Sequence, residues 1–203
     1  MHEVDGAGGR SGDGVSQTAS RSGYGSTHTA STRRHMLIAL AGLPGAGKST
    51  LAKGLQAHLH AEIVSRDTIR MAEFPEWDDL AAKRAAFEIV RLDVSLLLRT
   101  GATVVVDGAT LATRGERHEL HELAAALDVP FVLLWLDLPP EVAAERITHD
   151  RHDAPPDRQP CLANAVAGRF EPPVGEDGVV HLDALVPAPA LLDAALQALG
   201  QRH

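Results

Sequence analysis

From residue 36 onward the chain alternates short apolar runs with longer stretches in which apolar residues recur at helical spacing. The apolar runs predict β-strands at residues 37–41, 62–65, 103–107, 131–136 and 179–182. The stretches between and after them predict helices at residues 48–60, 77–99, 113–127, 141–149, 161–169 and 190–199. Strands that are apolar throughout are typical of a parallel sheet covered by helices on both faces. The pattern therefore predicts an α/β fold.

Two stretches do not follow this alternation. Residues 1–34 are rich in Gly, Ser and Thr and lack both periodicities, which predicts a disordered tail before a domain at residues 35–203. Met36 is an alternative to Met1 as the start of the protein. Residues 149–160, HDRHDAPPDRQP, are polar and proline-rich and lie between two predicted helices. We interpret them as a mobile flap.

Length, charge and cysteine content limit the class of protein and the compartment that fit this chain. A chain of 203 residues suits one α/β domain with a core, and its formal charge of -8 lacks the basic excess used for non-specific duplex binding. Cys161 is the only cysteine, which excludes an intrachain disulfide and fits a reducing cytoplasm. The apolar run at residues 36–43 is far shorter than the roughly 20 residues of a membrane span.

The first predicted strand leads into a phosphate-binding motif. GLPGAGKS, from Gly42 to Ser49, satisfies G-x-x-x-x-G-K-[ST] between a strand and a helix. Its backbone N–H groups and the helix N-terminus are expected to hold the phosphates of ATP. The expected loop contacts are Gly42, Pro44, Gly45, Ala46 and Gly47. The alternative, a glycine turn with an incidental Lys-Ser pair, is disfavoured by this context.

The residues after the glycines are expected to act on the phosphates. Lys48 is predicted to reach the β- and γ-phosphates as a cation, and the Ser49 hydroxyl to bind Mg²⁺. Thr50 is predicted to contact the α-phosphate.

The second predicted strand is followed by SRDTIR, from Ser65 to Arg70. Ligands of open α/β sheets bind at this carboxyl end of the strands, so Asp67 is a candidate general base for an acceptor hydroxyl. Arg70, three residues on, can orient that carboxylate or hold an anionic part of the acceptor. An N-cap with a solvated ion pair explains Asp67 equally well, and the pattern alone leaves both open.

Asp107 ends the third predicted strand and is the candidate Walker B carboxylate, a direct or water-mediated ligand of Mg²⁺. The alternative is a turn aspartate before Gly108. Thr110 and Arg114 follow within reach of a substrate.

Four segments together resemble a known family: GLPGAGKST, VSRDTIR, VVVDGATL, and the stretch from ERITHDR to VAGRFEPP. In order and spacing they resemble the small P-loop kinases related to polynucleotide 5′-kinase, AAA-type ATP-binding proteins within the zeta-toxin-like group. The resemblance covers about residues 36–173. It implies a P-loop three-layer sandwich with a five-stranded parallel sheet in the order 2-3-1-4-5 and a mobile lid.

The resemblance also implies roles for individual residues. The aspartate matching Asp67 is the base, the arginine matching Arg70 helps to position it, and arginines of the flap cover the transferring phosphate. The matching flap arginines are Arg146, Arg151 and Arg158, with Arg151 the first choice. A solvated basic loop is the alternative for each. DGATL departs from the family's D-A-T-N-L pattern because it lacks the Asn, which leaves its role in the acceptor pocket open.

The function predicted from these residues is transfer of the ATP γ-phosphate to a hydroxyl of a small molecule, such as a sugar, a nucleoside or an antibiotic. A polynucleotide 5′-hydroxyl is an alternative acceptor. A nucleotide-driven switch is a different class, which needs no acceptor base. The loop at residues 183–189 is the expected place of the adenine.

Other side chains are interpreted as structural. His118 and His121 do not have the spacing of H-E-x-x-H, and we interpret them as exposed helix residues. His149 and His152, beside Asp150 and Asp153, are explained by a hydrated loop. The remaining candidates are expected in the core or the pocket wall, namely Phe74, Trp77 and Phe87.

Overall fold

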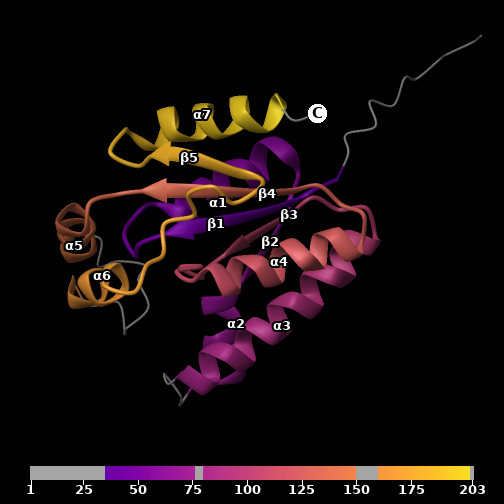
Figure 1. The fold of residues 1–203 in the computed structure, drawn as a ribbon, viewed down its shortest axis with the longest axis horizontal. Helices are drawn as coiled ribbons and strands as arrows, with labels where there is room; N and C mark the ends of the chain where they lie inside the picture. Colours follow the sequence, from indigo (N-terminus) through magenta and orange to yellow (C-terminus); the bar gives the residue numbers. More distant parts are fainter. Residues whose placement is uncertain (1–34, 76–79, 150–159, 202–203) are drawn as a thin grey trace, which may run out of the picture. The chain divides into compact units, whose positions relative to one another are not determined.

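A five-stranded parallel sheet forms the centre of the protein in the computed structural model, which describes residues 35–75, 80–149 and 160–201. The strands are β1 (Leu37–Gly42), β2 (Glu62–Ser65), β3 (Val104–Asp107), β4 (Phe131–Asp137) and β5 (Val179–Asp183). Their order is β2-β3-β1-β4-β5, and all pairings are parallel (Figure 1). The predicted sheet and strand order are confirmed, with strand ends within one residue of the predicted ones.

Seven helices connect and cover these strands within the described ranges. They are α1 (Lys48–Leu59), α2 (Arg66–Glu73), α3 (Leu80–Arg99), α4 (Arg114–Ala126), α5 (Pro140–His149), α6 (Pro160–Ala167) and α7 (Ala188–Gly200). Helix α2 was not predicted, and α3 begins at Leu80. The predicted helix start at Trp77, the tail at residues 1–34 and the centre of the flap at residues 150–159 lie outside the described residues.

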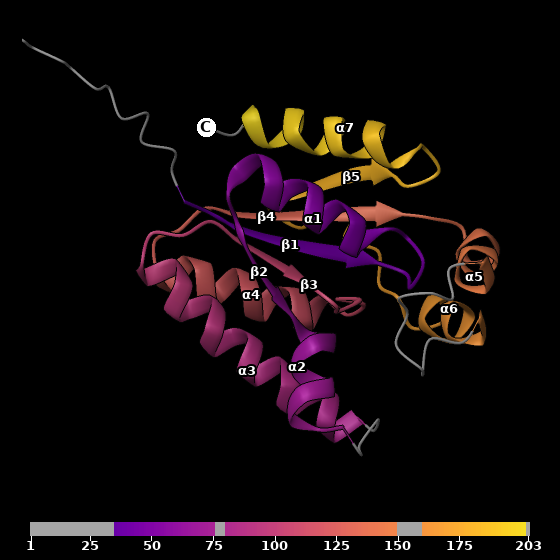
Figure 2. The same ribbon diagram turned by 180° about the vertical axis from the view of Figure 1, so that it is seen from behind.

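Helices cover both faces of the sheet and form the two outer layers of the sandwich (Figures 1 and 2). Alternate residues of β1 point to opposite faces, so Ile38 and Leu40 pack with α1 and α7, whereas Leu37 and Ala39 pack with α3 and α4. Every residue of β1 is buried. This two-sided burial explains why β1 is apolar throughout.

The carboxyl ends of the strands carry the site. β1 pairs with β3 on one side and with β4 on the other, and the chain passes from β3 through α4 to β4 across it. Open α/β sheets bind ligands at such a reversal of strand order. Helices α5 and α6 pack against each other beyond the ends of β1 and β4 (Figure 1).

Within the three described ranges, no helix combines the length and the apolar character that a membrane crossing requires.

Candidate active site

Glycines let the loop between β1 and α1 pack closely against α5 and leave its backbone N–H groups available to an anion. Gly45 and Gly47 have φ values of 87° and 90°, a left-handed conformation that favours glycine. A Cβ on Gly45 would lie 2.7 Å from the carbonyl oxygen of Ala143 on α5, so the loop packs directly against that helix. Gly47 is the N-cap of α1 and provides no side-chain cap. The N–H groups of the first turn therefore remain available to phosphate oxygens.

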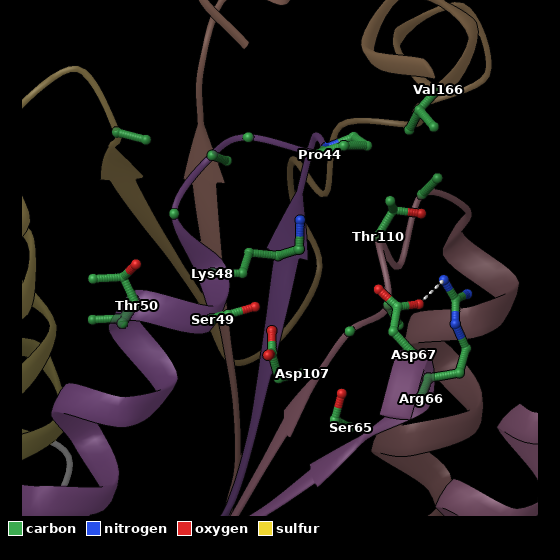
Figure 3. Close-up of a pocket in the computed structure, with 18 of the residues that line it drawn as sticks. Pro44, Lys48, Ser49, Thr50, Ser65, Arg66, Asp67, Asp107, Thr110 and Val166 are labelled. Atoms are coloured by element: carbon green, nitrogen blue, oxygen red, sulfur yellow. Dashed lines mark ion pairs between the residues drawn. The ribbon is translucent and has the colours of Figure 1, made fainter. Parts of the chain in front are cut away.

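Lys48 bends back over this loop. Its side chain is buried, and its Nζ donates to the carbonyl oxygens of Gly42 at 2.8 Å and Leu43 at 2.9 Å. Figure 3 shows the side chain running from the start of α1 across the end of β1 toward the loop. The predicted lysine thus lies where its ammonium group reaches the rim of the phosphate loop.

A cavity of about 1200 Å³ opens beside this loop and takes lining residues from both layers of helices. The loop and the first turn of α1, residues 44–50, line it together with Asp67, Asp107 and Thr110. On the side of α7, residues 184–188 line it, inside the loop predicted to hold the adenine. The structure therefore brings together most of the described residues that the sequence singled out.

Asp107 is the carboxylate whose surroundings fit a metal ion. It ends β3 in register with Ser65 of β2, is 6% exposed, and has an Oδ1 atom with no hydrogen-bond partner in the described structure. A buried carboxylate oxygen without a partner is costly unless a ligand satisfies it. Figure 3 shows the Ser49 hydroxyl and the Asp107 carboxylate directed toward one another. A hydroxyl and a carboxylate are oxygen ligands of the kind that Mg²⁺ takes.

Asp67 lies in the first turn of α2, and the N-cap interpretation for it is wrong. Ser65 is the N-cap, since its Oγ accepts the N–H of Thr68 at 3.4 Å. The Asp67 side chain is 28% exposed and forms an ion pair with Arg66, with 3.5 Å between Nη2 and Oδ1. Helix α2 therefore holds the carboxylate at the cavity without using it as a cap.

Arg66 lies where the spacing placed Arg70, at the cavity beside Asp67. Arg66 lines the cavity beside Asp67, as Figure 3 shows. Arg70 is buried, with 6% exposure, and is not among the described residues that line the cavity. The role of Arg70 in positioning Asp67 stays a prediction, while Arg66 is a site residue that the sequence reasoning missed.

Gly108 brings β3 and α2 into contact at this point. Its φ is 70°, and a Cβ there would lie 2.6 Å from Ser65 Oγ and 2.7 Å from the backbone nitrogen of Asp67. Only a residue without a Cβ allows this approach. The backbone after Asp107 thus supports the turn that carries Asp67.

Basic side chains reach the cavity from α5 and from the chain after α6, the two helices that flank the predicted flap and are called the lid helices below. Arg146 and His149 of α5 line the cavity, as does Arg169, two residues beyond the end of α6. Arg151 and Arg158 lie outside the described residues. Arg169 was not predicted, although the quoted segment VAGRFEPP contains it.

The chain after α6 is fastened to the start of α4. The backbone N–H of Arg114 donates to Glu171 Oε2 at 2.7 Å, and the side chain of Arg114 is exposed and not among the described lining residues. Arg117 is 1% exposed and pairs with both carboxylate oxygens of Glu176, at 2.5 and 2.9 Å. Its third bond goes to the carbonyl oxygen of Leu111, at 2.8 Å. We call this set of contacts the Arg117 brace.

The remaining structural interpretations can be checked in part. His118 is exposed and His121 is half-buried, with side chains 66% and 41% exposed, and with Glu122 they form a group whose ligand atoms lie within 4.8 Å of one another. Phe87 is buried and lines the cavity, as a core or pocket-wall residue should. Phe74 is half-buried.

Comparison with known proteins decides the family. The model of a family described as an AAA domain matches residues 37–173. The chain belongs to this AAA domain family. The matched range of this AAA domain includes Lys48, Asp67 and Asp107.

Two kinases are similar to this AAA domain chain in sequence. A shikimate kinase from Corynebacterium glutamicum is 29% identical over 123 residues, which span 57% of this chain and 66% of that enzyme, just under two thirds. An adenylyl-sulfate kinase from Myxococcus xanthus is 28% identical over 156 residues, 72% of this chain and 82% of that enzyme. Both are kinases of small molecules by their names.

Solved structures share the fold. A gluconokinase from Sinorhizobium meliloti 1021 superposes with a TM-score of 0.66 at 20% identity, covering 83% of this chain and 94% of its own. An APS kinase from Mycobacterium tuberculosis, in complex with AMPPNP and APS, has a TM-score of 0.63 at 18% identity, covering 82% and 98%. The fold of this AAA domain is that of small P-loop kinases.

Proposed function

We propose that the protein is an ATP-dependent kinase that transfers the γ-phosphate to a hydroxyl group of a small-molecule acceptor. The observation that carries the proposal is the placement of Asp67 on the same cavity as Lys48 and the Asp107 carboxylate. A nucleotide switch needs the lysine and the metal ligand but has no use for a carboxylate on the acceptor side. The similarity to shikimate and adenylyl-sulfate kinases supports the same conclusion.

Phosphate binding and charge neutralisation are the first requirement of the reaction. The loop N–H groups and Lys48 hold the β- and γ-phosphates, and Thr50 contacts the α-phosphate. A magnesium ion held by Ser49 and Asp107 supplies further positive charge beside the same phosphates when it is bound. Arg146 adds a cation from α5, and the two flap arginines, Arg151 and Arg158, are proposed to complete the cover.

Proton transfer is the task of Asp67. Its carboxylate accepts the proton of the acceptor hydroxyl as that oxygen forms a bond to the γ-phosphorus. The bond from the γ-phosphorus to the bridging oxygen breaks, and ADP leaves with its electron pair. The cap at Ser65 fixes the start of α2 and thereby the position of Asp67. Arg70 supports the same turn from the buried side.

A polynucleotide 5′-hydroxyl is the second candidate acceptor. The resemblance of the four motif segments to polynucleotide 5′-kinase and the zeta-toxin-like group favours it. The formal charge of -8 and the small substrates named for the two curated relatives favour a small molecule. We propose a cytoplasmic location, since ATP is the donor and the single cysteine excludes an intrachain disulfide.

Label transfer from γ-labelled ATP tests the proposal. Acceptors with a carboxylate or sulfate, neutral sugars, nucleosides, aminoglycosides and 5′-hydroxyl oligonucleotides form the panel. Asp67→Asn keeps the shape of the side chain and removes the base, so we expect a fall in transfer of about 10²- to 10⁴-fold with ATP affinity retained. Lys48→Ala should also reduce transfer, because it removes the cation that contacts the β- and γ-phosphates.

Asp128→Asn is the matched control, because Asp128 is exposed and precedes the amino end of β4, away from the cavity. It should transfer phosphate at the wild-type rate. If Asp67→Asn transfers phosphate as fast as Asp128→Asn does, Asp67 is not the base. Hydrolysis of ATP at an unchanged rate in Asp67→Asn, with no labelled acceptor for the wild type, supports the switch instead.

A further inference from the structure

Among the described residues, the acceptor side of the cavity is lined by more cations than carboxylates. Arg66, Lys83, Arg84 and Arg169 line it from α2, α3 and the end of α6, against Asp67 and Glu116. The Glu116 carboxylate is occupied, because it accepts the Thr113 N–H at 3.2 Å in the capping box of α4. The described residues thus give this side of the cavity a local positive excess, in a chain whose formal charge is -8.

The positive charge of Arg84 is already balanced by neighbouring carboxylates. Its guanidinium pairs with Glu119 through two bonds of 2.7 and 3.0 Å and with Glu88 at 2.6 Å. The hydrogen bond to Glu119 raises the pKa of Arg84 above its ordinary value, so the group stays charged. Arg84 therefore acts first as a link between α3 and α4.

Arg66 has a different environment. Its side chain is 13% exposed, and its Nε–H is buried without a hydrogen-bond partner in the described structure. Its ion pair with Asp67 spans 3.5 Å, longer than the 2.7–2.9 Å of a strong charged hydrogen bond. A guanidinium offers five donors in a planar fork that matches an oxyanion, and the Nε donor of this fork has no acceptor among the described residues.

A buried donor without a partner is destabilising, and its presence at the wall of a cavity needs a cause. The side chain is fixed at the first position of α2, directly before the residue that faces the reacting hydroxyl. In Figure 3 the guanidinium lies beside the Asp67 carboxylate at the cavity. The arrangement suits an acceptor in which one group binds Arg66 while the hydroxyl faces Asp67.

We propose that Arg66 binds an anionic oxygen group of the acceptor, a carboxylate, sulfate or phosphate, and thereby selects acidic hydroxyl compounds. The inference rests on the proposed kinase function and names its substrate class. Because Arg66 and Asp67 are consecutive and in contact, the anionic group and the phosphorylated hydroxyl are separated by only a few bonds. Small hydroxy acids and sugar acids meet this condition.

A structural role for Arg66 is the competing explanation. In that case Arg66 only orients the Asp67 carboxylate and no acceptor anion contacts it. Replacement of Arg66 then alters the rate constant and its pH profile for every acceptor equally, charged or neutral. Under our proposal the loss is confined to binding, and it depends on the acceptor's charge.

Anion binding can be measured without turnover. The protein is saturated with Mg²⁺ and AMPPNP, so that the phosphate loop is filled, and its melting temperature is followed against inorganic sulfate. Gluconate is the carboxylate probe, and glucose is its neutral counterpart. Sulfate also stabilises proteins by exclusion from their surface, which adds a non-saturating rise common to all variants.

We expect a saturable rise with sulfate or gluconate in the wild type, absent in Arg66→Gln and partly kept in Arg66→Lys. Arg99→Gln is the matched control, because Arg99 is exposed in the last turn of α3, outside the cavity lining. Retained AMPPNP binding shows that Arg66→Gln is folded. A response to sulfate alone indicates a sulfate or phosphate acceptor, and a response to gluconate alone indicates a carboxylate.

Transfer kinetics complete the test. With an acidic acceptor, Arg66→Gln should raise KM about 10- to 100-fold while kcat changes little, and a neutral acceptor should show no such split. A saturable rise in Arg66→Gln equal to that of Arg99→Gln, or none in the wild type, overturns the inference. Either outcome leaves Asp67-dependent label transfer unaffected, so failure here is distinct from failure of the kinase proposal.

Discussion

Gly108 sets the position of the candidate base from a different strand. It follows Asp107, the candidate metal ligand at the end of β3, and its Cα faces the first turn of α2 at a distance that leaves no room for a Cβ. The contacting atoms are Ser65 Oγ and the backbone nitrogen of Asp67. A shift of this turn moves Asp67 relative to the phosphates, and misplacement of about 1 Å can cost roughly 10²-fold in rate.

We therefore predict that Gly108→Ala lowers phosphate transfer by about 10- to 100-fold while ATP affinity stays near that of the wild type. The added methyl group meets backbone atoms, which cannot rotate away as a flexible side chain could. Steady-state kinetics with the acceptor found by label transfer, together with AMPPNP titration, provide the measurement.

Gly101→Ala is the control that separates misplacement of Asp67 from the effect of backbone strain. Gly101 has a φ of 81°, close to that of Gly108, but a Cβ there meets no atom within 4 Å. Both substitutions carry the cost of a left-handed alanine, about 1 kcal/mol of stability. If Gly101→Ala lost as much transfer as Gly108→Ala, general destabilisation would account for both, and the support proposed for Asp67 would be wrong.

Individual site residues were predictable where a motif fixes both identity and spacing. Lys48 and Asp107 follow from the phosphate loop and from the end of an apolar strand. Arg66 was missed because a spacing of three residues favours Arg70 for the face of Asp67, and burial of Arg70 depends on contacts distant in sequence. The environment of Gly108 likewise depends on β2 and α2, which no local pattern reveals.

At the scale of elements, the Arg117 brace joins α4 to the chain that returns from the lid. Arg117 is almost wholly buried, whereas the Glu176 side chain is 17% exposed. The bonds also hold the Leu111 carbonyl, in the loop that begins at Gly108. The Arg117 brace thus connects the chain that follows α6 with the loop that begins at Gly108.

We predict that Glu176→Gln destabilises the fold by about 3 kcal/mol, because it leaves a buried guanidinium without its counter-charge. Arg117→Met should cost less, although it is the larger chemical change. It replaces the buried cation with an apolar chain of similar length, and Glu176 can regain water. Urea unfolding with equal m-values for the two variants and the wild type measures the difference.

The Arg84 and Glu119 pair provides the comparison for this prediction. This pair also consists of two bonds, here between α3 and α4, but its side chains are 51% and 28% exposed. Exposed pairs contribute little, so Glu119→Gln should cost less than about 1 kcal/mol. Equal losses for Glu119→Gln and Glu176→Gln would contradict the argument from burial.

The elements themselves were predictable when they were long or apolar throughout. The five strands are short apolar runs and the six helices have strong periodicity, and apart from the start of α3 their ends were placed within two residues. Helix α2 was missed because it has eight residues, is mostly polar, and starts at a serine that also ends β2. The strand order came from the resemblance, since local periodicity does not say which strands are neighbours.

At the scale of the whole molecule, the cavity connects elements that are far apart in sequence. The loop after β1, the start of α2, the end of β3, both lid helices and the start of α7 all line it. We propose that residues 35–203 form this kinase domain, since the described contacts begin with Met36, whose carbonyl accepts the Val104 N–H at 2.9 Å. A ligand in this cavity therefore stabilises several elements at once.

Metal-dependent stabilisation by a nucleotide follows from this arrangement. AMPPNP with Mg²⁺ at about 100 times its Kd adds about 2.7 kcal/mol to the free energy of unfolding. For a domain of this size we expect a rise of about 5–10 °C in Tm. AMPPNP with EDTA should produce a smaller rise, because the charge supplied beside the phosphates is missing.

Asp107→Asn tests whether the unsatisfied Oδ1 atom serves the metal. Without ligand, replacing the buried charge by a neutral amide should leave the free energy of unfolding unchanged or raise it by about 1 kcal/mol. With AMPPNP, addition of Mg²⁺ should no longer increase Tm, whereas the Asp128→Asn control keeps the full increase. A variant that is less stable without ligand and still responds to Mg²⁺ would show that Asp107 is a structural turn residue. A gain in stability together with loss of the Mg²⁺ response means that this part of the fold gives up stability to keep a metal ligand ready at the phosphates.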